Sequence, residues 1–344
     1  MPPPLPALSI KYVIKNTMGS GCWLSGHEAT GPRLRRTAFF IYRCAMNPWP
    51  ALPADVVDWF RSAFADANGA ATSRLFNIPN IHEPALDDAL IEALIPLSPP
   101  RLLPSGAVVE MNIHNIGGLR RFHRWETADI GIIVFVYRTG NLLAQKIGLL
   151  QSKRLYPANR DVDDDDPVCF AYGMNKFLRR DPKSVLSRLH QQFDFNDDCI
   201  YAALQTGSKQ IAAMASFTAK FGEALYYLLY NPPSLPVTVY YPVTTKQAVD
   251  SPPLGCRVFT VADIDRALTP LTTNTAPTFK QVQNAKPASD WRLEHWAADL
   301  LLSCQVGRQF DASDDSLVSN LLVRRSGPIG AAIAISIELG QAAG

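Results

Sequence analysis

Long apolar runs are missing from this chain, and so are paired cysteines. A helix that crosses a bilayer needs about 20 consecutive apolar residues, and no stretch of the sequence approaches that length. The first residues lack the charged start and apolar core of a secretion signal. The six cysteines are scattered, with no CxxC pair and no zinc-ligand spacing. These absences predict a soluble, cytoplasmic protein with reduced thiols that does not associate with membranes.

Several catalytic signatures are also missing. The six histidines never occur at the HxxxH or HExxH spacing of a zinc hydrolase, and no GxSxG motif marks a seryl nucleophile. Neither a GxxxxGK phosphate loop nor a dinucleotide-binding glycine pattern is present. The acidic run at residues 161–166 lacks the glycine and the closing glutamate of an EF-hand, so we interpret it as a solvated loop.

Charge is scarce and nearly balanced. Hydrophobic residues make up 47% of the 344 residues and charged residues 19%, which is a globular composition. The net charge is only +2, so a nucleic-acid-binding surface would have to be a local basic patch. The length allows one large domain or two ordinary ones.

The most informative stretch covers residues 126–155. Residues 129–137 form a β-branched and aromatic run, residues 138–141 carry the glycine and asparagine of a turn, and residues 146–153 form a second apolar run. This pattern predicts two strands joined as an antiparallel hairpin.

Three polar side chains would meet at one end of this hairpin. Side chains two positions apart on a strand point to the same face, so Gln151 and Lys153 project together, and antiparallel pairing brings Asp129 near both. Carboxylate and amide oxygens suit Mg²⁺ or Mn²⁺, and a lysine can orient water or offset charge on a phosphate. A further carboxylate is expected from Glu110 or Glu126, and the sequence leaves the choice open.

An aspartate that opens one strand, a hairpin, and a second strand that ends in Gln-Ser-Lys together resemble the restriction-endonuclease-like PD-(D/E)xK nuclease superfamily, in the branch with QxK in place of ExK. The resemblance implies that Asp129 and Gln151 hold the metal ion and that Lys153 is the catalytic lysine. It also implies an αβββαβ core over roughly residues 84–242 and hydrolysis of DNA phosphodiester bonds. Ala128 stands where the motif has proline, and Gln151 carries no charge, so metal binding would depend on Asp129 and the further carboxylate.

A basic and aromatic segment lies between the two candidate glutamates, at residues 120–125. Arginines can bind a phosphate backbone while aromatic rings stack on bases. The candidate nucleic-acid-binding residues are Arg120, Arg121, Arg124 and Arg154. The alternative interpretation is a structural cluster that pairs with nearby acids.

Three regions are expected along the chain. Residues 1–104 would hold an N-terminal strand and helices that partly pack on the core, residues 105–242 the nuclease-like core, and residues 243–344 an α/β extension. Helical periodicity predicts helices at residues 53–64, 84–95, 184–193, 208–221, 262–268 and 291–304. The second of these helices carries acids that we interpret as a solvated face, namely Asp87, Asp88 and Glu92.

The remaining strands are expected at residues 10–14, 107–115, 223–231, 237–241 and 257–261. A threonine- and proline-rich stretch at residues 269–287 is interpreted as a connector. The alternating residues 331–338 could extend the sheet or form an interface. The predicted fold is therefore an α/β protein with a mixed central β-sheet flanked by helices, a restriction-endonuclease-like core, and additions at both ends.

The predicted function is Mg²⁺-dependent (or Mn²⁺-dependent) DNA cleavage, and the resemblance implies a prokaryotic restriction or anti-phage defence effector. Two alternatives stay open: a catalytically inactive nucleic-acid-binding or scaffolding subunit of a defence complex, and a nuclease that cuts RNA with the same site. Besides nucleic acid, a protein from a multi-gene defence system and a second copy of the chain are considered as partners.

Overall fold

Two helices open the described part of the chain. The computed structural model describes residues 48–115, 128–158, 191–241, 245–311 and 329–340. Helix α1 (Ala54–Asn77) has Asp55 in its first turn, where a negative charge is favourable. Helix α2 (Glu83–Leu94) has Pro84 in its first turn and continues into a short 3₁₀ turn, η1 (Ile95–Leu97). Both predicted helices are present, and α1 runs well past its predicted end. Their apolar faces are buried through Phe60, Phe64, Leu75, Leu86, Leu90 and Leu94.

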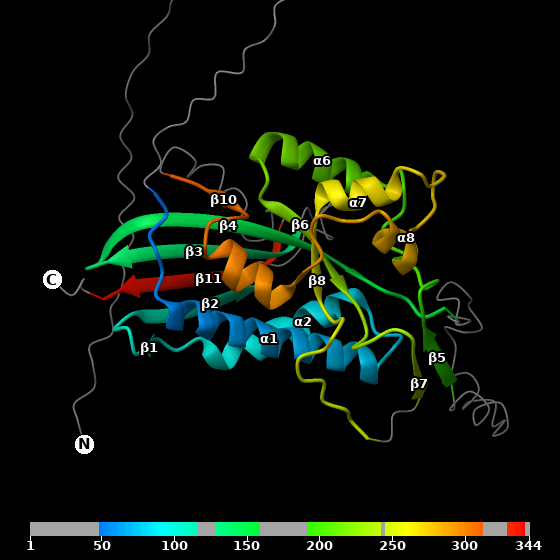
Figure 1. Ribbon diagram of the computed structural model, residues 1–344, viewed down its shortest axis with the longest axis horizontal. Helices are drawn as coiled ribbons and strands as arrows, with labels where there is room; N and C mark the ends of the chain where they lie inside the picture. Colours follow the sequence, from blue (N-terminus) through cyan, green and yellow to red (C-terminus); the bar gives the residue numbers. More distant parts are fainter. Residues whose placement is uncertain (1–47, 116–127, 159–190, 242–244, 312–328, 341–344) are drawn as a thin grey trace, which may run out of the picture. The chain divides into compact units, whose positions relative to one another are not determined.

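A mixed nine-stranded sheet forms the centre of the described structure (Figure 1). The strands lie in the order β1-β2-β11-β3-β4-β6-β8-β9, with β10 paired to β4. Their bounds are β1 (Arg101–Leu102), β2 (Val108–Asn115), β3 (Ala128–Arg138), β4 (Asn141–Arg154), β6 (Leu225–Tyr230), β8 (Arg257–Thr260), β9 (Trp291–Arg292), β10 (Arg308–Gln309) and β11 (Ile329–Leu339). The predicted class, an α/β protein with a mixed central sheet, is confirmed.

The hairpin predicted from the sequence is β3 and β4. The two strands pair antiparallel, with Ile130 opposite Leu150. The turn passes through Thr139 and Gly140, whose φ angles are 50° and 75°. Two consecutive positive φ angles are what a tight hairpin loop requires, because they match the twist of the flanking strands.

The last strand lies inside the sheet. β11 pairs antiparallel with β2 and parallel with β3, so it separates these two strands. Ile333 at its middle is fully buried and pairs with Ile113 on one side and Ile132 on the other. Of the two roles that the sequence left open for this segment, extension of the sheet is the one observed. Alternating alanine and isoleucine suit a strand that is covered on both faces.

The side chains of β6 show which helices cover each face of the sheet. The hydroxyl of Tyr230 reaches Asp87 of α2, whereas Tyr227 faces the charge of Asp265 on α7 (Val261–Leu268). Residues three apart on a strand point to opposite faces, so α2 and α7 cover opposite faces. The predicted helix that precedes β6 is also present as α6 (Lys209–Phe221), with Ser208 as its N-cap.

Three predicted elements are corrected by the structure. The described end of the predicted helix at 184–193 is strand β5 (Gln191–Phe195), which pairs with β7 (Val237–Tyr241) in a separate two-stranded sheet. The predicted helix at 291–304 is present but shorter, because β9 occupies its first two residues and the helical part ends as a π-helix, η3 (His295–Leu301). The predicted connector contains helix α8 (Phe279–Asn284), which begins with a capping box. β5 and β9 form because strands distant in sequence pair with them, whereas α8 begins with a local capping box inside a stretch whose threonines and prolines had suggested a connector. The predicted strand at 10–14 lies outside the described residues.

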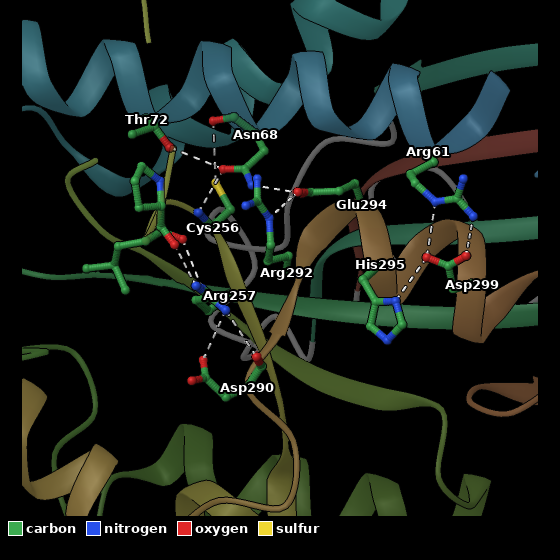
Figure 2. Close-up of polar contacts among 12 residues, drawn as sticks. Arg61, Asn68, Thr72, Cys256, Arg257, Asp290, Arg292, Glu294, His295 and Asp299 are labelled. Atoms are coloured by element: carbon green, nitrogen blue, oxygen red, sulfur yellow. Dashed lines mark hydrogen bonds and ion pairs between the residues drawn. The ribbon is translucent and has the colours of Figure 1, made fainter. Parts of the chain in front are cut away.

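A polar network joins α1 to the segment that includes β8 and η3 (Figure 2). Asn68 is fully buried; its amide donates to Glu294 at 2.9 Å, and its carbonyl oxygen accepts the backbone N–H of Cys256 at 2.8 Å. Arg61 makes a two-pronged contact with Asp299. All the described residues belong to one compact unit, residues 45–344.

Candidate active site

Asp129, Gln151 and Lys153 lie together where β3 begins and β4 ends. Gln151 donates its amide N–H to the Asp129 carboxylate. The Lys153 side chain is almost completely buried, and its ammonium donates to the backbone carbonyl of Ser152 at 2.5 Å. Antiparallel pairing therefore places Asp129 against Gln151, with Lys153 at the adjoining end of β4.

The Asp129 carboxylate is hydrogen-bonded through one oxygen. Oδ2 accepts the Gln151 amide, the Ser152 backbone N–H at 2.8 Å and the Ser152 hydroxyl at 2.8 Å, and none of the described residues donates to Oδ1. The amide oxygen of Gln151 is buried, with no hydrogen-bond partner among the described residues. A buried polar atom without a partner is costly. These two oxygens are therefore available to a ligand that needs electron-pair donors.

Glu83, in the first turn of α2, is the ion-pair partner of Lys153. Its Oε1 lies 3.1 Å from the Lys153 ammonium, and its Oε2 accepts the backbone N–H of Arg154 at 3.2 Å. Burial raises the pKa of Glu83, while the charge of Lys153 acts to lower it and the charge of Asp129 to raise it. An unpaired buried ammonium would be strongly destabilising, so Glu83 is what allows Lys153 to occupy this position.

Asp87, one turn further along α2, is buried against the same cluster. This corrects the sequence interpretation, which placed Asp87 on a solvated face; the residue is only 9% exposed. The Tyr230 hydroxyl donates to its Oδ1 at 2.7 Å, and the Ser152 hydroxyl lies 2.9 Å from its Oδ2. Burial raises the pKa of Asp87 well above its usual range, and the charge of Asp129 raises it further.

The carboxylates beside Asp129 thus come from α2. The sequence had favoured Glu110 or Glu126 for this role. Glu110 lies on β2 at the level of Phe135 of β3, because β11 pairs with both strands. A strand rises about 3.3 Å per residue, so the offset between Asp129 and Phe135 puts Glu110 about 20 Å along the sheet from Asp129. Glu126 lies outside the described residues.

Arg154, expected to contact nucleic acid, lies inside the protein. It is 1% exposed and donates to the backbone carbonyls of Pro79, at 2.6 Å, and Ile81. Its guanidinium also stacks on the Tyr156 ring, 4.2 Å from the ring centroid. These contacts fasten the end of β4 to the loop before α2. The other three candidates lie outside the described residues: Arg120, Arg121 and Arg124.

One carboxylate and one amide oxygen are a small donor set for a divalent cation and would leave most of its coordination positions to water. Among the described residues, no group of three or more His, Cys, Asp or Glu side chains is placed to hold a metal ion. Asp129 and Gln151 offer two oxygens, and Mg²⁺ is commonly bound through one or two protein groups and several waters. The unpaired Gln151 oxygen is the observation that favours a cation here, because an amide oxygen is a hard ligand.

Four residues of the cluster were missed by sequence reasoning: Glu83, Asp87, Ser152 and Tyr230. The only signal for Glu83 was its place in the first turn of a helix, which is ordinary for an acid. Ser152 lies between Gln151 and Lys153, and strict alternation along the strand would have pointed it away from Asp129. Contacts among α2, β4 and β6 are tertiary, so no local pattern could have grouped these residues.

No protein-family model, curated protein or solved structure matches the chain. Among the described residues, no helix is both long enough and apolar enough to cross a membrane.

Proposed function

We propose that this protein is a metal-dependent nuclease that hydrolyses DNA phosphodiester bonds. One observation carries the proposal: the Gln151 amide donates to the Asp129 carboxylate and has a buried oxygen without a partner among the described residues, and both residues lie beside the buried ammonium of Lys153. Oxygen ligands next to a cation suit a reaction in which negative charge builds up on a phosphate. The resemblance to the PD-(D/E)xK superfamily, based on the same three residues, supports the same activity.

The order of the elements also supports a restriction-endonuclease-like core. α2, β2, β3, β4, α6 and β6 follow the αβββαβ order, with β3 and β4 antiparallel and β4 and β6 parallel. β11 would be an addition that lies between the first two strands of this core.

In the proposed reaction, Asp129 and Gln151 would hold Mg²⁺ or Mn²⁺. A bound cation of this kind lowers the pKa of its water and offsets charge on the phosphate. Lys153 supplies a positive charge that is already desolvated and held in place by Glu83, so it can donate to a phosphate oxygen or to the attacking water without first being reoriented.

The biological setting is proposed from the resemblance alone, since one fold hosts many activities. It would be a cytoplasmic restriction or anti-phage effector in a prokaryote, working alone, as a homo-oligomer, or with another protein of a defence system. RNA cleavage by the same site is the alternative substrate class, because the proposed metal and phosphate chemistry is shared.

A second candidate function is a catalytically inactive nucleic-acid-binding or scaffolding subunit. It is favoured by the neutral Gln151 at the position where most of the superfamily has an acid, because a neutral ligand holds a divalent cation less tightly. The chain's net charge of +2 is also low for a protein that binds nucleic acid by itself.

The test is digestion of plasmid DNA, single-stranded DNA and RNA by purified protein with Mg²⁺, Mn²⁺ or EDTA. We expect metal-dependent cleavage that falls at least about 100-fold in an Asp129→Ala, Lys153→Ala double variant. A matched control, Asp88→Ala with Lys209→Ala, removes the same charges from exposed positions. Cleavage that survives in the first variant would refute the site. Binding without cleavage in the wild type would favour the scaffolding function.

A further inference from the structure

The Ser152 hydroxyl lies between two carboxyl groups. Its oxygen is 2.9 Å from Oδ2 of Asp87 and 2.8 Å from Oδ2 of Asp129, and the residue is fully buried. On the far side of Asp87, the Tyr230 hydroxyl is 2.7 Å from Oδ1. The four groups form an unbroken line that runs from β6 through α2 and β4 to β3.

If both carboxyl groups are ionised, this chain of hydrogen-bonded groups contains too few hydrogens: three contacts must be made with only the hydrogens of the Tyr230 and Ser152 hydroxyls. A serine hydroxyl carries one hydrogen and can donate it to one acceptor. Tyr230 uses its own hydrogen on Oδ1 of Asp87. One of the two contacts made by Ser152 would then join two oxygens with no hydrogen between them. A proton on one of the two carboxyl groups satisfies every contact.

The surroundings assign that proton to Asp87. Asp129 is half-buried, and two further N–H groups, from Gln151 and the backbone of Ser152, already point their hydrogens at its Oδ2. Asp87 is buried and receives no N–H donor from the described residues. Besides Asp129, the charged group that acts on Asp87 is Glu83, on the same helix. The raised pKa of Asp87 agrees with this assignment.

We propose that Asp87 is a neutral carboxylic acid that positions Asp129 through Ser152. Asp87 donates to the Ser152 oxygen, and Ser152 donates to Oδ2 of Asp129. The Tyr230 hydroxyl donates to the other oxygen of Asp87, Oδ1. This arrangement fixes the Asp129 carboxylate through Oδ2, while Oδ1 receives no hydrogen bond from the described residues, and it keeps one negative charge out of a cluster of three acidic residues. The protonation state stands on geometry alone, whereas the benefit to metal binding rests on the proposed nuclease function.

Asparagine tests the first part of the proposal, because its amide has the shape and hydrogen-bonding pattern of the neutral acid. We expect Asp87→Asn to fold and to bind Mn²⁺ within about threefold of the wild-type dissociation constant, whereas Asp87→Ala weakens Mn²⁺ binding about 10- to 100-fold. A merely structural residue would not separate the two variants in metal affinity at equal thermal stability. Failure of Asp87→Asn to fold, or a loss of affinity equal to that of Asp87→Ala, would overturn the proposal.

Infrared spectroscopy of the metal-free protein tests the proton directly. The wild-type minus Asp87→Asn difference spectrum at neutral pH should contain the carbonyl band of a protonated carboxylic acid. A carboxylate band in its place would overturn the proposal, whatever the cleavage assay shows. If the band is present but the wild type neither binds metal nor cuts nucleic acid, the proposed nuclease function is refuted. The proposal that Asp87 is a neutral acid is then still supported.

Discussion

At the scale of single residues, Arg154 shows how neighbours remove a basic side chain from solvent. Its guanidinium lies on the Tyr156 ring and donates to two carbonyls of the loop that leads into α2. Arginine is well suited to this role because its planar group donates several hydrogen bonds and also stacks. The sequence interpretation had grouped Arg154 with Arg120, Arg121 and Arg124 as a nucleic-acid contact.

We expect Arg154→Ala to lower the free energy of unfolding by about 2–4 kcal/mol, because a buried and a partly buried carbonyl lose their donor and a cavity is left. Urea unfolding measures the change. Arg138→Ala, at the exposed end of β3, is the control and should stay within about 0.5 kcal/mol. If Arg154→Ala instead weakened nucleic-acid binding at unchanged stability, the residue would be a ligand contact.

The pKa of Asp263 is lowered, in contrast to the raised pKa of Asp87. Burial acts to raise its pKa, but hydrogen bonds from the Ser289 side chain and backbone and from the Ala288 backbone outweigh that effect and lower it to about 2. The ionised form is therefore more favourable in the folded state than in the unfolded chain. Its contribution is fully present above the unfolded pKa of about 4 and is lost as the pH falls toward 2.

We expect Asp263→Asn to remove the part of the pH dependence of folding stability that comes from this carboxylate. The wild type should lose about 2 kcal/mol of this stabilisation between pH 4 and pH 2, and the variant should lose correspondingly less over the same range. Thermal unfolding across that range measures the difference, with the exposed Asp88→Asn as control. Parallel pH profiles for wild type and Asp263→Asn would contradict the assignment.

At the scale of secondary-structure elements, α2 and β11 have different roles: α2 contributes acids to the candidate site, and β11 lies between two strands of the sheet. α2 brings Glu83 and Asp87 to the end of β4, so a helix that reads as an ordinary amphipathic element supplies two acids of the candidate site. β11 holds β2 and β3 apart and contributes none of the hydrogen bonds that the described residues make within the site. One element therefore builds the site, and the other builds the sheet that carries it.

The central position of β11 predicts a large effect of truncating its side chains. We expect Ile333→Ala, at a fully buried position, to lower the free energy of unfolding by about 2–4 kcal/mol through lost burial and a cavity. The same kind of truncation in the edge strand β1, Leu102→Ala, changes a residue that is 71% exposed and should alter the free energy of unfolding by less than about 0.5 kcal/mol. Equal, small effects in urea unfolding would mean that β11 does not pack as a central strand.

At the scale of the whole molecule, the fold is closed by contacts between segments far apart in the chain. Asn68 and Glu294 meet in the interior, while Arg61 and Asp299 meet nearer the surface (Figure 2). Interior polar pairs carry a larger penalty when one partner is lost, because the other is left buried without a hydrogen bond.

A double-mutant cycle tests this difference. We expect Asn68→Ala and Glu294→Ala to show a coupling of about 1–3 kcal/mol in unfolding free energy. The more exposed pair, Arg61→Ala with Asp299→Ala, should couple by less than about 1 kcal/mol. Equal coupling in the two cycles would indicate that burial does not set the strength of this network.

The sequence by itself determined the local elements and the core of the candidate site. β-branched runs and turn residues located the β3–β4 hairpin, and the two-residue period with antiparallel pairing brought Asp129 to Gln151. These features depend on residues within one hairpin, so local pattern and strand geometry are enough to predict them.

Only the tertiary structure decided which other side chains join that hairpin. Glu83 and Asp87 come from a helix, Tyr230 from a strand that pairs beside β4, and the central place of β11 from the far end of the chain. The same packing buried Arg154 and moved Glu110 away from Asp129. The physical reason is that burial and long-range pairing depend on the summed contacts of many segments, and no short stretch of sequence encodes that sum.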